Sequence, residues 1–246
     1  MSRWKAAAIH LSISAVIGLV AAILIFGVWY PPPYGQATGA TKLAVLLLGV
    51  DLVLGPLLTL VVFKAGKKSL KFDLSVIALL QACAFIYGMS VVVRARPVFI
   101  VAAVDRFTLI TANDLDEADR EHAPPAFRVL PWNGPRVIGA QPPADPQEKL
   151  DVLFSSLAGK DIDKMPIHYV DYAAVAPSLL QRAKRLSDLR ERMPDAAATI
   201  DQWLGTHRRA DSDVVWVPLS ARTTSMVALL DRADGTLLGA LPIDPW

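Results

Sequence analysis

The sequence predicts a membrane protein with three N-terminal transmembrane α-helices, followed by a small α+β domain with an antiparallel sheet. Three apolar runs lie near the N-terminus, at about residues 6–29, 43–63 and 74–93. In residues 97–246, strand patterns at both ends enclose a stretch with helix patterns. The chain of 246 residues is 53% hydrophobic with a mean hydropathy of +0.39, yet 20% of it is charged. This mixture indicates a membrane region joined to a water-exposed domain.

Each apolar run has about the 20 residues that an α-helix needs to cross the hydrocarbon layer of a bilayer. The first run is longer than the apolar core of a signal peptide, which has about 7–15 residues, and Ala37-Thr38-Gly39 is a poor cleavage site. We therefore expect the first run to remain as a transmembrane helix, so that residues 1–96 form a three-helix membrane region embedded in the lipid bilayer.

Lysine and arginine are unevenly distributed along the chain. Up to Arg96 there are nine of them against two acidic residues, whereas from Pro97 onward there are 16 against 21. Six of the nine lie at the N-terminus and between the second and third runs. The positive-inside rule therefore predicts a cytoplasmic N-terminus and places residues 97–246 on the opposite side of the membrane. Because the basic excess belongs to the membrane region, we expect no nucleic-acid partner.

The sequence contains no recognisable catalytic or metal-binding motif. Cys83 is the only cysteine, so an intrachain disulfide and a multi-thiolate metal site are both excluded. There is no H-E-x-x-H, G-x-S-x-G, P-loop or G-x-G-x-x-G pattern. His168 and Asp171 could act as acid and base, but a single histidine in an apolar, aromatic stretch is typical of a packed side chain. We expect no enzyme activity, no metal and no cofactor.

The second apolar run contains two residues that a lipid-facing helix avoids, Asp51 and Pro56. A charge at this depth costs roughly 2.5–3.5 kcal/mol on insertion scales, so Asp51 should face protein or water, or be protonated. Asp51, Gly55 and Thr59 repeat every four residues and share one helix face. Small residues in such a row allow helices to approach closely.

Residues of the neighbouring runs are predicted to lie near Asp51. Ser14 and Gly18 repeat at the same spacing in the first run, and Gly18 and Tyr87 lie level with Asp51. Two interpretations remain open. Either Asp51 hydrogen-bonds to Tyr87 or Ser14 and holds the bundle together, or its face, with Ser14 and Gly18, forms a docking groove for a partner's transmembrane helix. Proton or ion transport is disfavoured, because no second acid lies within the membrane.

Pro56 is expected to have a structural partner in the third run. It lacks an N–H and therefore leaves the carbonyl of Leu52 without its usual donor. Gln81 is predicted to lie level with Pro56 and to donate a hydrogen bond to that carbonyl. Pro56, Gln81 and Tyr87 are therefore expected to be structural residues within the membrane.

Residues 97–246 are predicted to form one domain, with two strands followed by helices and then three strands. Asp145 begins the first helix as its N-cap, with proline at the first helical position. Later helices are expected at about 177–193 and 196–204, and a turn at 232–235 joins the last two strands as a hairpin. The first helix has four apolar residues on one face that should pack inward: Leu150, Leu153, Phe154 and Leu157.

Four parts of the sequence resemble one protein family. They are MSRWKAAAIHLSIS, LLGVDLVLGPLLTLVVFK with the following GKKSLKFDLSVIALLQ, the ARPVF and VDRF pair, and the terminal LLGALPIDPW. With these residues the chain resembles the type IV pilin accessory proteins of the TfpX/TfpZ kind over nearly its whole length. The resemblance implies an inner-membrane protein of Gram-negative bacteria with a periplasmic C-terminal domain. It brings no catalytic residues.

The resemblance also implies a partner and a role. The protein would bind the cognate major pilin, alongside other pilus assembly components, and support its stability or assembly into type IV pili in the manner of a chaperone. Our hypothesis from the sequence is that the face formed by Asp51, Gly55 and Thr59 contacts the pilin helix and that the domain contacts the pilin head. A membrane-anchored periplasmic ligand-binding sensor is the alternative, which the short cytoplasmic segments disfavour. An envelope enzyme is a third class, and no site supports it.

Overall fold

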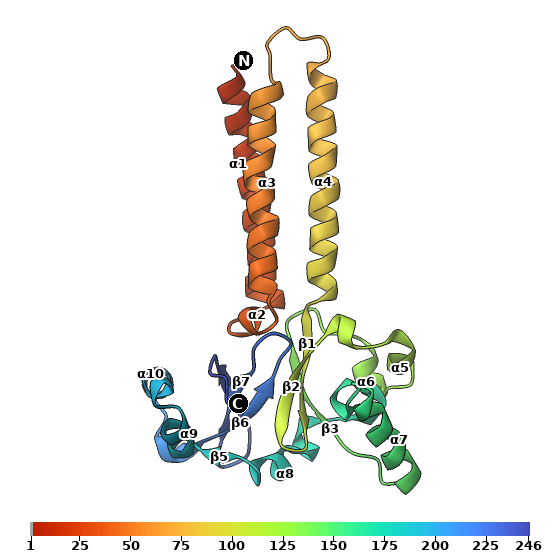
Figure 1. Cartoon of the computed structure of the whole chain (residues 1–246), viewed down its shortest axis with the longest axis vertical. Coiled ribbons are helices and arrows are strands. Elements are labelled where there is room, and N and C mark those ends of the chain that lie inside the picture. The colour runs from red at the N-terminus through yellow and green to blue at the C-terminus, as the bar shows by residue number, and fades with distance from the viewer. Residues whose placement is uncertain (1) are drawn as a thin grey trace.

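A computed structural model describes residues 2–246 and shows a long helical bundle standing on a compact domain (Figure 1). Three helices in it are long and apolar enough to cross a membrane. The first consists of α1 (Arg3–Ala22) and its π-helical continuation η1 (Ile23–Trp29), and the others are α3 (Ala40–Val62) and α4 (Leu70–Arg94). They cover the three predicted apolar runs except for residue 63, which caps α3, so the three runs are helical as expected. Which end faces the cytoplasm stays a prediction.

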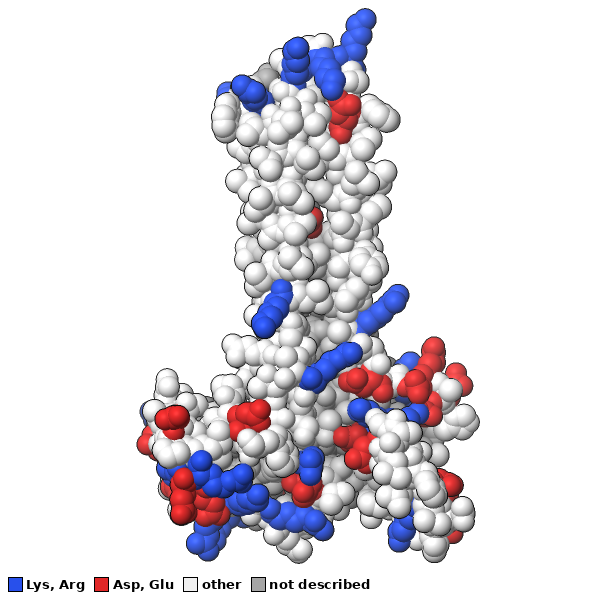
Figure 2. Space-filling view, in the orientation of Figure 1, with Lys and Arg blue, Asp and Glu red and all other residues white. Residues whose placement is uncertain are grey.

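The bundle is organised around α3, because both α1 and α4 pack against it. Its charges gather at the end far from the domain and at the base, with a nearly uncharged band between them (Figure 2). Asp51 is the only charged residue between Lys42 and Lys64. The band therefore matches the hydrocarbon layer in character.

The domain contains one eight-stranded mixed sheet, in the order β4-β3-β1-β2-β6-β7-β8, with β5 paired to β6. The strands are β1 (Pro97–Ala103), β2 (Arg106–Thr111), β3 (Arg136–Ala140), β4 (Tyr169–Val170), β5 (Lys184–Arg185), β6 (Val214–Ser220), β7 (Met226–Asp231) and β8 (Leu237–Leu241). The five strands that the sequence predicted are β1, β2, β6, β7 and β8.

The prediction of an antiparallel sheet is wrong in two places. The pairs β1/β3 and β2/β6 are parallel, whereas the other pairs are antiparallel. Strands joined by a tight turn must run antiparallel, but a parallel pair requires a long crossover connection. Residues 104–135, which include β2, connect β1 to β3, and residues 112–213 connect β2 to β6; the helices of the domain lie in these connections.

Helices cover both faces of the sheet. On one face α8 (Ala176–Leu180) and the short α2 (Tyr34–Ala37) contribute to a core with β1, β2, β6 and β7. The other face carries two cores. One lies beneath α5 (Glu117–Glu121), α6 (Pro125–Arg128) and α7 (Pro146–Leu157), and the other beneath α9 (Leu186–Arg192) and α10 (Ala197–His207). Strand β1 is buried along its whole length because both of its faces are covered.

The helix predicted at 177–193 is instead divided. Its ends form α8 and α9, and between them lies β5, where Lys184 pairs with Trp216 of β6. The indole N–H of Trp216 donates a hydrogen bond of 3.0 Å to the carbonyl of Arg185. Pairing with β6 therefore overrides the local helical preference of this stretch.

The loop between α1 and α3 is part of the domain core. Ala37 is buried in it, and its carbonyl accepts a hydrogen bond of 2.9 Å from the N–H of Thr223. On the other side, α4 leads into β1 through only Ala95 and Arg96. The guanidinium of Arg96 lies 4.3 Å from the ring centre of Trp132, whose ring is also near that of Trp29 at the end of η1. Bundle and domain thus meet in an extensive packed junction.

Candidate functional site

A groove lies in the bundle between α1 and α4, with α3 as its floor. It encloses about 410 Å³ and is almost entirely apolar in lining. Its residues are His10, Ile13, Ser14, Ile17 and Gly18 from α1, Leu48 and Asp51 from α3, and Ala78, Gln81, Ala82, Phe85 and Ile86 from α4. Three of the predicted site residues, Ser14, Gly18 and Asp51, are therefore brought together on one surface.

Asp51 lies at the centre of this groove and of its helix, eleven residues from either end of α3. The carboxylate has no hydrogen-bond or ion-pair partner among residues 2–246; the bond that involves this residue is made by its backbone carbonyl. The expected bonds to Tyr87 or Ser14 do not form. Tyr87 is 73% exposed and does not line the groove.

Gly55 and Thr59 lie behind the groove, inside the bundle. Thr59 is only 3% exposed, and its hydroxyl is 2.6 Å from Nδ1 of His10, which ties α3 to α1. A Cβ on Gly55 would lie 2.7 Å from Oε1 and 2.8 Å from Cδ of Gln81. Glycine at this position therefore lets α4 approach α3. The row that the sequence predicted is divided, since Asp51 faces the groove while Gly55 and Thr59 hold the helices together.

Gln81 connects α4 to α3, but not as predicted beside Pro56. Its Nε2 donates a hydrogen bond of 3.4 Å to the carbonyl of Asp51 rather than to that of Leu52. Its Oε1 is buried and has no hydrogen-bond partner in the part of the chain that the structure describes. Pro56 remains within an unbroken helix. Gln81 therefore donates a hydrogen bond to a backbone carbonyl of α3, as predicted, but the acceptor is Asp51 and not Leu52.

Of the α4 wall of the groove, the sequence analysis singled out Gln81 alone, and as a structural residue. Ala78 and Ala82 lie four residues apart and share a face, as Ser14 and Gly18 do on α1. The four-residue spacing of these small residues could have indicated from the sequence that this face of α4 takes part in helix packing.

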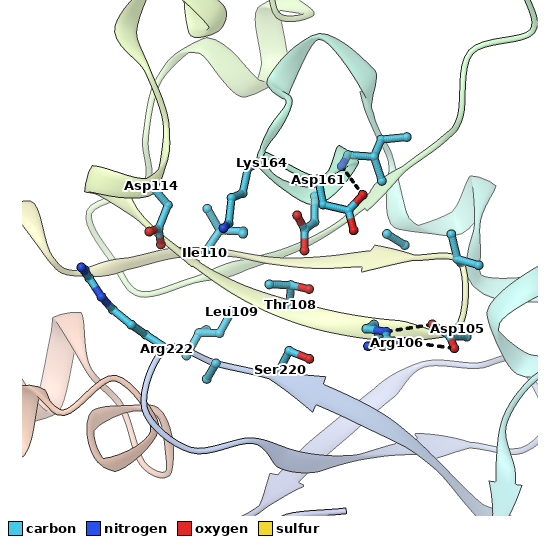
Figure 3. Close-up of a pocket in the computed structure, with 15 residues that line it drawn as sticks. Asp105, Arg106, Thr108, Leu109, Ile110, Asp114, Asp161, Lys164, Ser220 and Arg222 are labelled. Atoms are coloured by element: carbon cyan, nitrogen blue, oxygen red, sulfur yellow. Dashed lines mark hydrogen bonds and ion pairs between the residues drawn. The ribbon is translucent and has the colours of Figure 1, made fainter. Parts of the chain in front are cut away.

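A second cavity, of about 630 Å³, lies in the domain where β2 and β6 pair over only two residues. Figure 3 shows its charged lining, in which Asp114, Asp161 and Lys164 lie on one side of β2 and Arg222 on the other. Burial raises the pKa of Asp163, which also lines this cavity. The hydrogen bond from Arg106, 2.9 Å long, lowers the pKa of Asp105.

Neither a metal-binding cluster nor the His168–Asp171 pair considered from the sequence is found in the described part of the chain. Among residues 2–246 no group of three or more His, Cys, Asp or Glu side chains could hold a metal ion. Asp171 accepts a hydrogen bond from the N–H of Ala173 as a helix cap. Burial lowers the pKa of His168. His168 makes no hydrogen bond or ion pair with Asp171 among residues 2–246.

Helix α7 presents an apolar face to the outside. It begins at Pro146 with the Asp145 carboxylate accepting from two backbone N–H groups, as predicted. However, the four residues expected to pack inward are exposed, from 46% for Leu150 to 78% for Leu157. The helix contacts the core of the domain through Val152 on its opposite side instead. The periodicity correctly predicted an apolar face but not its direction.

Together, the fold and the groove define a class: a three-helix membrane protein with a mixed-sheet domain fixed to one end of the bundle. The family model described as "Fimbrial assembly protein FimB" matches residues 1–39. Over 185 residues the chain is 33% identical to "Fimbrial assembly protein, serogroup I" of Dichelobacter nodosus, covering 74% of this chain and 72% of that protein. The serogroup E1 protein is 34% identical over the same shares. The chain belongs to the fimbrial assembly protein family. No solved structure matches it.

Proposed function

We propose that the protein is an inner-membrane accessory protein of the TfpX/TfpZ kind, which binds its cognate major pilin and supports its stability or assembly into type IV pili. Membership of the fimbrial assembly family is the observation that carries this proposal. In this proposal the N-terminus is cytoplasmic and the domain is periplasmic. No residue is given a catalytic role.

The membrane groove is the proposed contact for the pilin's apolar helix. Hydrophobicity gives no net drive for two helices to associate in lipid, so close packing and polar contacts must supply it. The groove offers both, because small residues of α1 and α4 line it and Asp51 lies at its floor. Gly55 and Thr59 support this surface from behind rather than touching the client.

The exposed face of α7 is the proposed contact for the pilin head. Four large apolar side chains in one row on a water-exposed helix are typical of a protein-binding surface. Figure 1 shows α7 on the part of the domain remote from the bundle, which suits a soluble partner rather than lipid. The two surfaces together would hold a membrane-anchored client at its helix and at its head.

Co-purification of an affinity-tagged full-length chain from piliated cells tests the function. A pilin should dominate the captured material. Ala82→Leu fills the groove and should reduce capture, whereas Cys83→Leu, at an exposed neighbouring position outside the groove, should not. Likewise, the double change Leu153→Asp and Phe154→Asp should reduce capture, with Gln147→Asp on the same helix as the matched control. Unchanged pilin capture and piliation in the groove and α7 variants would refute the proposed contacts.

A periplasmic ligand sensor is the second candidate, and the charged domain cavity is the observation that favours it. The two candidates predict different partners. Thermal-shift screening of the full-length protein against small charged metabolites, with Arg222→Ala as the variant that alters the cavity, would support the sensor if a metabolite stabilised the parent chain and not the variant.

A further inference from the structure

The groove carries one acidic side chain, that of Asp51, which the bundle leaves without a partner among the described residues. The Asp51 carboxylate has no hydrogen-bond or ion-pair partner among residues 2–246. Gln81 also lines the groove, but its unpartnered Oε1 is buried against Gly55 inside the bundle and does not open onto this surface. The remaining lining is mostly aliphatic and aromatic. A carboxylate in an apolar surface of this kind calls for a hydrogen-bond donor from outside the bundle.

The donors within the groove do not meet this need. Nδ1 of His10 is engaged with Thr59, and Nε2 of Gln81 is engaged with the backbone of α3. Ser14 makes no hydrogen bond to Asp51 among the described residues. Water is scarce in the hydrocarbon layer, so an unpaired polar group there costs free energy that a binding partner can recover.

We infer that the groove accepts one transmembrane helix that carries a hydrogen-bond donor near the middle of its span, such as a side-chain amide, hydroxyl or amine. The position follows from Asp51, which lies midway along α3. Small side chains on both walls allow the backbone of the incoming helix to come close, and they are Ser14, Gly18, Ala78 and Ala82. The inference rests on the proposed function only for the identity of the client.

The test uses the full-length protein in proteoliposomes and synthetic Leu/Ala transmembrane peptides. One peptide has a single glutamine at its centre, a second has leucine there, and a third has the glutamine moved two turns toward one end. Binding is measured by energy transfer between a dye on the peptide and a dye on Lys68→Cys, in a chain whose native thiol is removed by Cys83→Ser. Lys68 lies in the exposed loop between α3 and α4, away from the groove.

The central-glutamine peptide should bind about three- to tenfold more tightly than the other two, the range that hydrogen bonds between membrane helices provide. Asp51→Ala should abolish this preference, and Asp51→Asn, which keeps an acceptor, should retain most of it. Val53→Ala, at a lipid-exposed position of the same helix, is the matched control. Equal affinities, a preference that survives Asp51→Ala, or no peptide binding would each overturn the inference.

The peptide experiment contains no pilin, so it fails or succeeds independently of the proposed function. A donor preference without pilin capture would leave the inference standing and refute the client. Pilin capture without a donor preference would support the proposed client and refute the inference.

Discussion

Replacing Gly55 by alanine tests the contact that holds α4 against α3. The added methyl would lie 2.7 Å from Oε1 of Gln81, well inside van der Waals contact. If the glutamine side chain moves away, it loses its bond to the Asp51 carbonyl, worth about 0.6 kcal/mol on average in membranes. If it stays, the helices must separate, which typically costs about 1–3 kcal/mol. We expect the free energy of unfolding to fall by about 1–2 kcal/mol, measured by denaturant unfolding in micelles.

A double-mutant cycle makes this prediction specific. Gln81→Ala removes the obstacle, so the double variant of Gly55 and Gln81 should be less destabilised than the sum of the two single variants. The difference should exceed the roughly 0.5 kcal/mol within which independent sites add. Gly49→Ala, on the same helix, is the control, because a methyl at that position meets nothing within 4 Å. Additive effects, or an equal loss in Gly49→Ala, would refute the reasoning.

Three further predictions concern the domain of the full-length chain. Gly139→Ala would place a methyl 2.5 Å from Cγ2 of Val175, a stiff β-branched side chain, so thermal unfolding should show a loss of about 1–3 kcal/mol; an unchanged Tm would contradict this. Asp145→Ala removes the N-cap of α7 and should cost about 0.5–2 kcal/mol, seen as reduced helical circular dichroism; full helicity would exclude a capping role. Because burial raises the pKa of Asp163 in the folded state, its charged form opposes folding at neutral pH. Asp163→Asn should therefore raise Tm at pH 7, and the gain should disappear as the pH falls below the unfolded pKa of about 3.9; a gain that did not depend on pH would argue against this cause.

The membrane helices and most of the strands could be predicted because their signals are local. Length and apolar character alone defined three spans, and a turn of Asp and Gly residues defined the last hairpin. The parallel pairs could not be predicted, since the short β3 pairs through its backbone with β1, which is distant in sequence. The division of 177–193 had the same origin, because Lys184 and Arg185 pair with β6.

The candidate site was predicted in its residues more than in its geometry. The four-residue spacing placed Asp51, Gly55 and Thr59 on one side of α3, but a helix face about 100° wide can meet two neighbours and a groove at once. Only the packing showed that Thr59 contacts His10 while Asp51 stays open. Tyr87 was predicted as a partner because it lies at the same depth as Asp51. Depth does not show which way a side chain points around the helix axis, and Tyr87 points away from the groove.

The double attachment of the domain has a mechanical consequence. One attachment is the two-residue passage from α4 into β1, and the other is the loop at Ala37, whose backbone carbonyl accepts hydrogen bonds from both Thr223 and Thr224. A single hinge would let the sheet swing beneath the helices, but two separate tethers oppose such a swing unless one of them breaks. The separation between the centre of the bundle and the far end of the sheet is therefore set by the protein itself and not by whatever it holds.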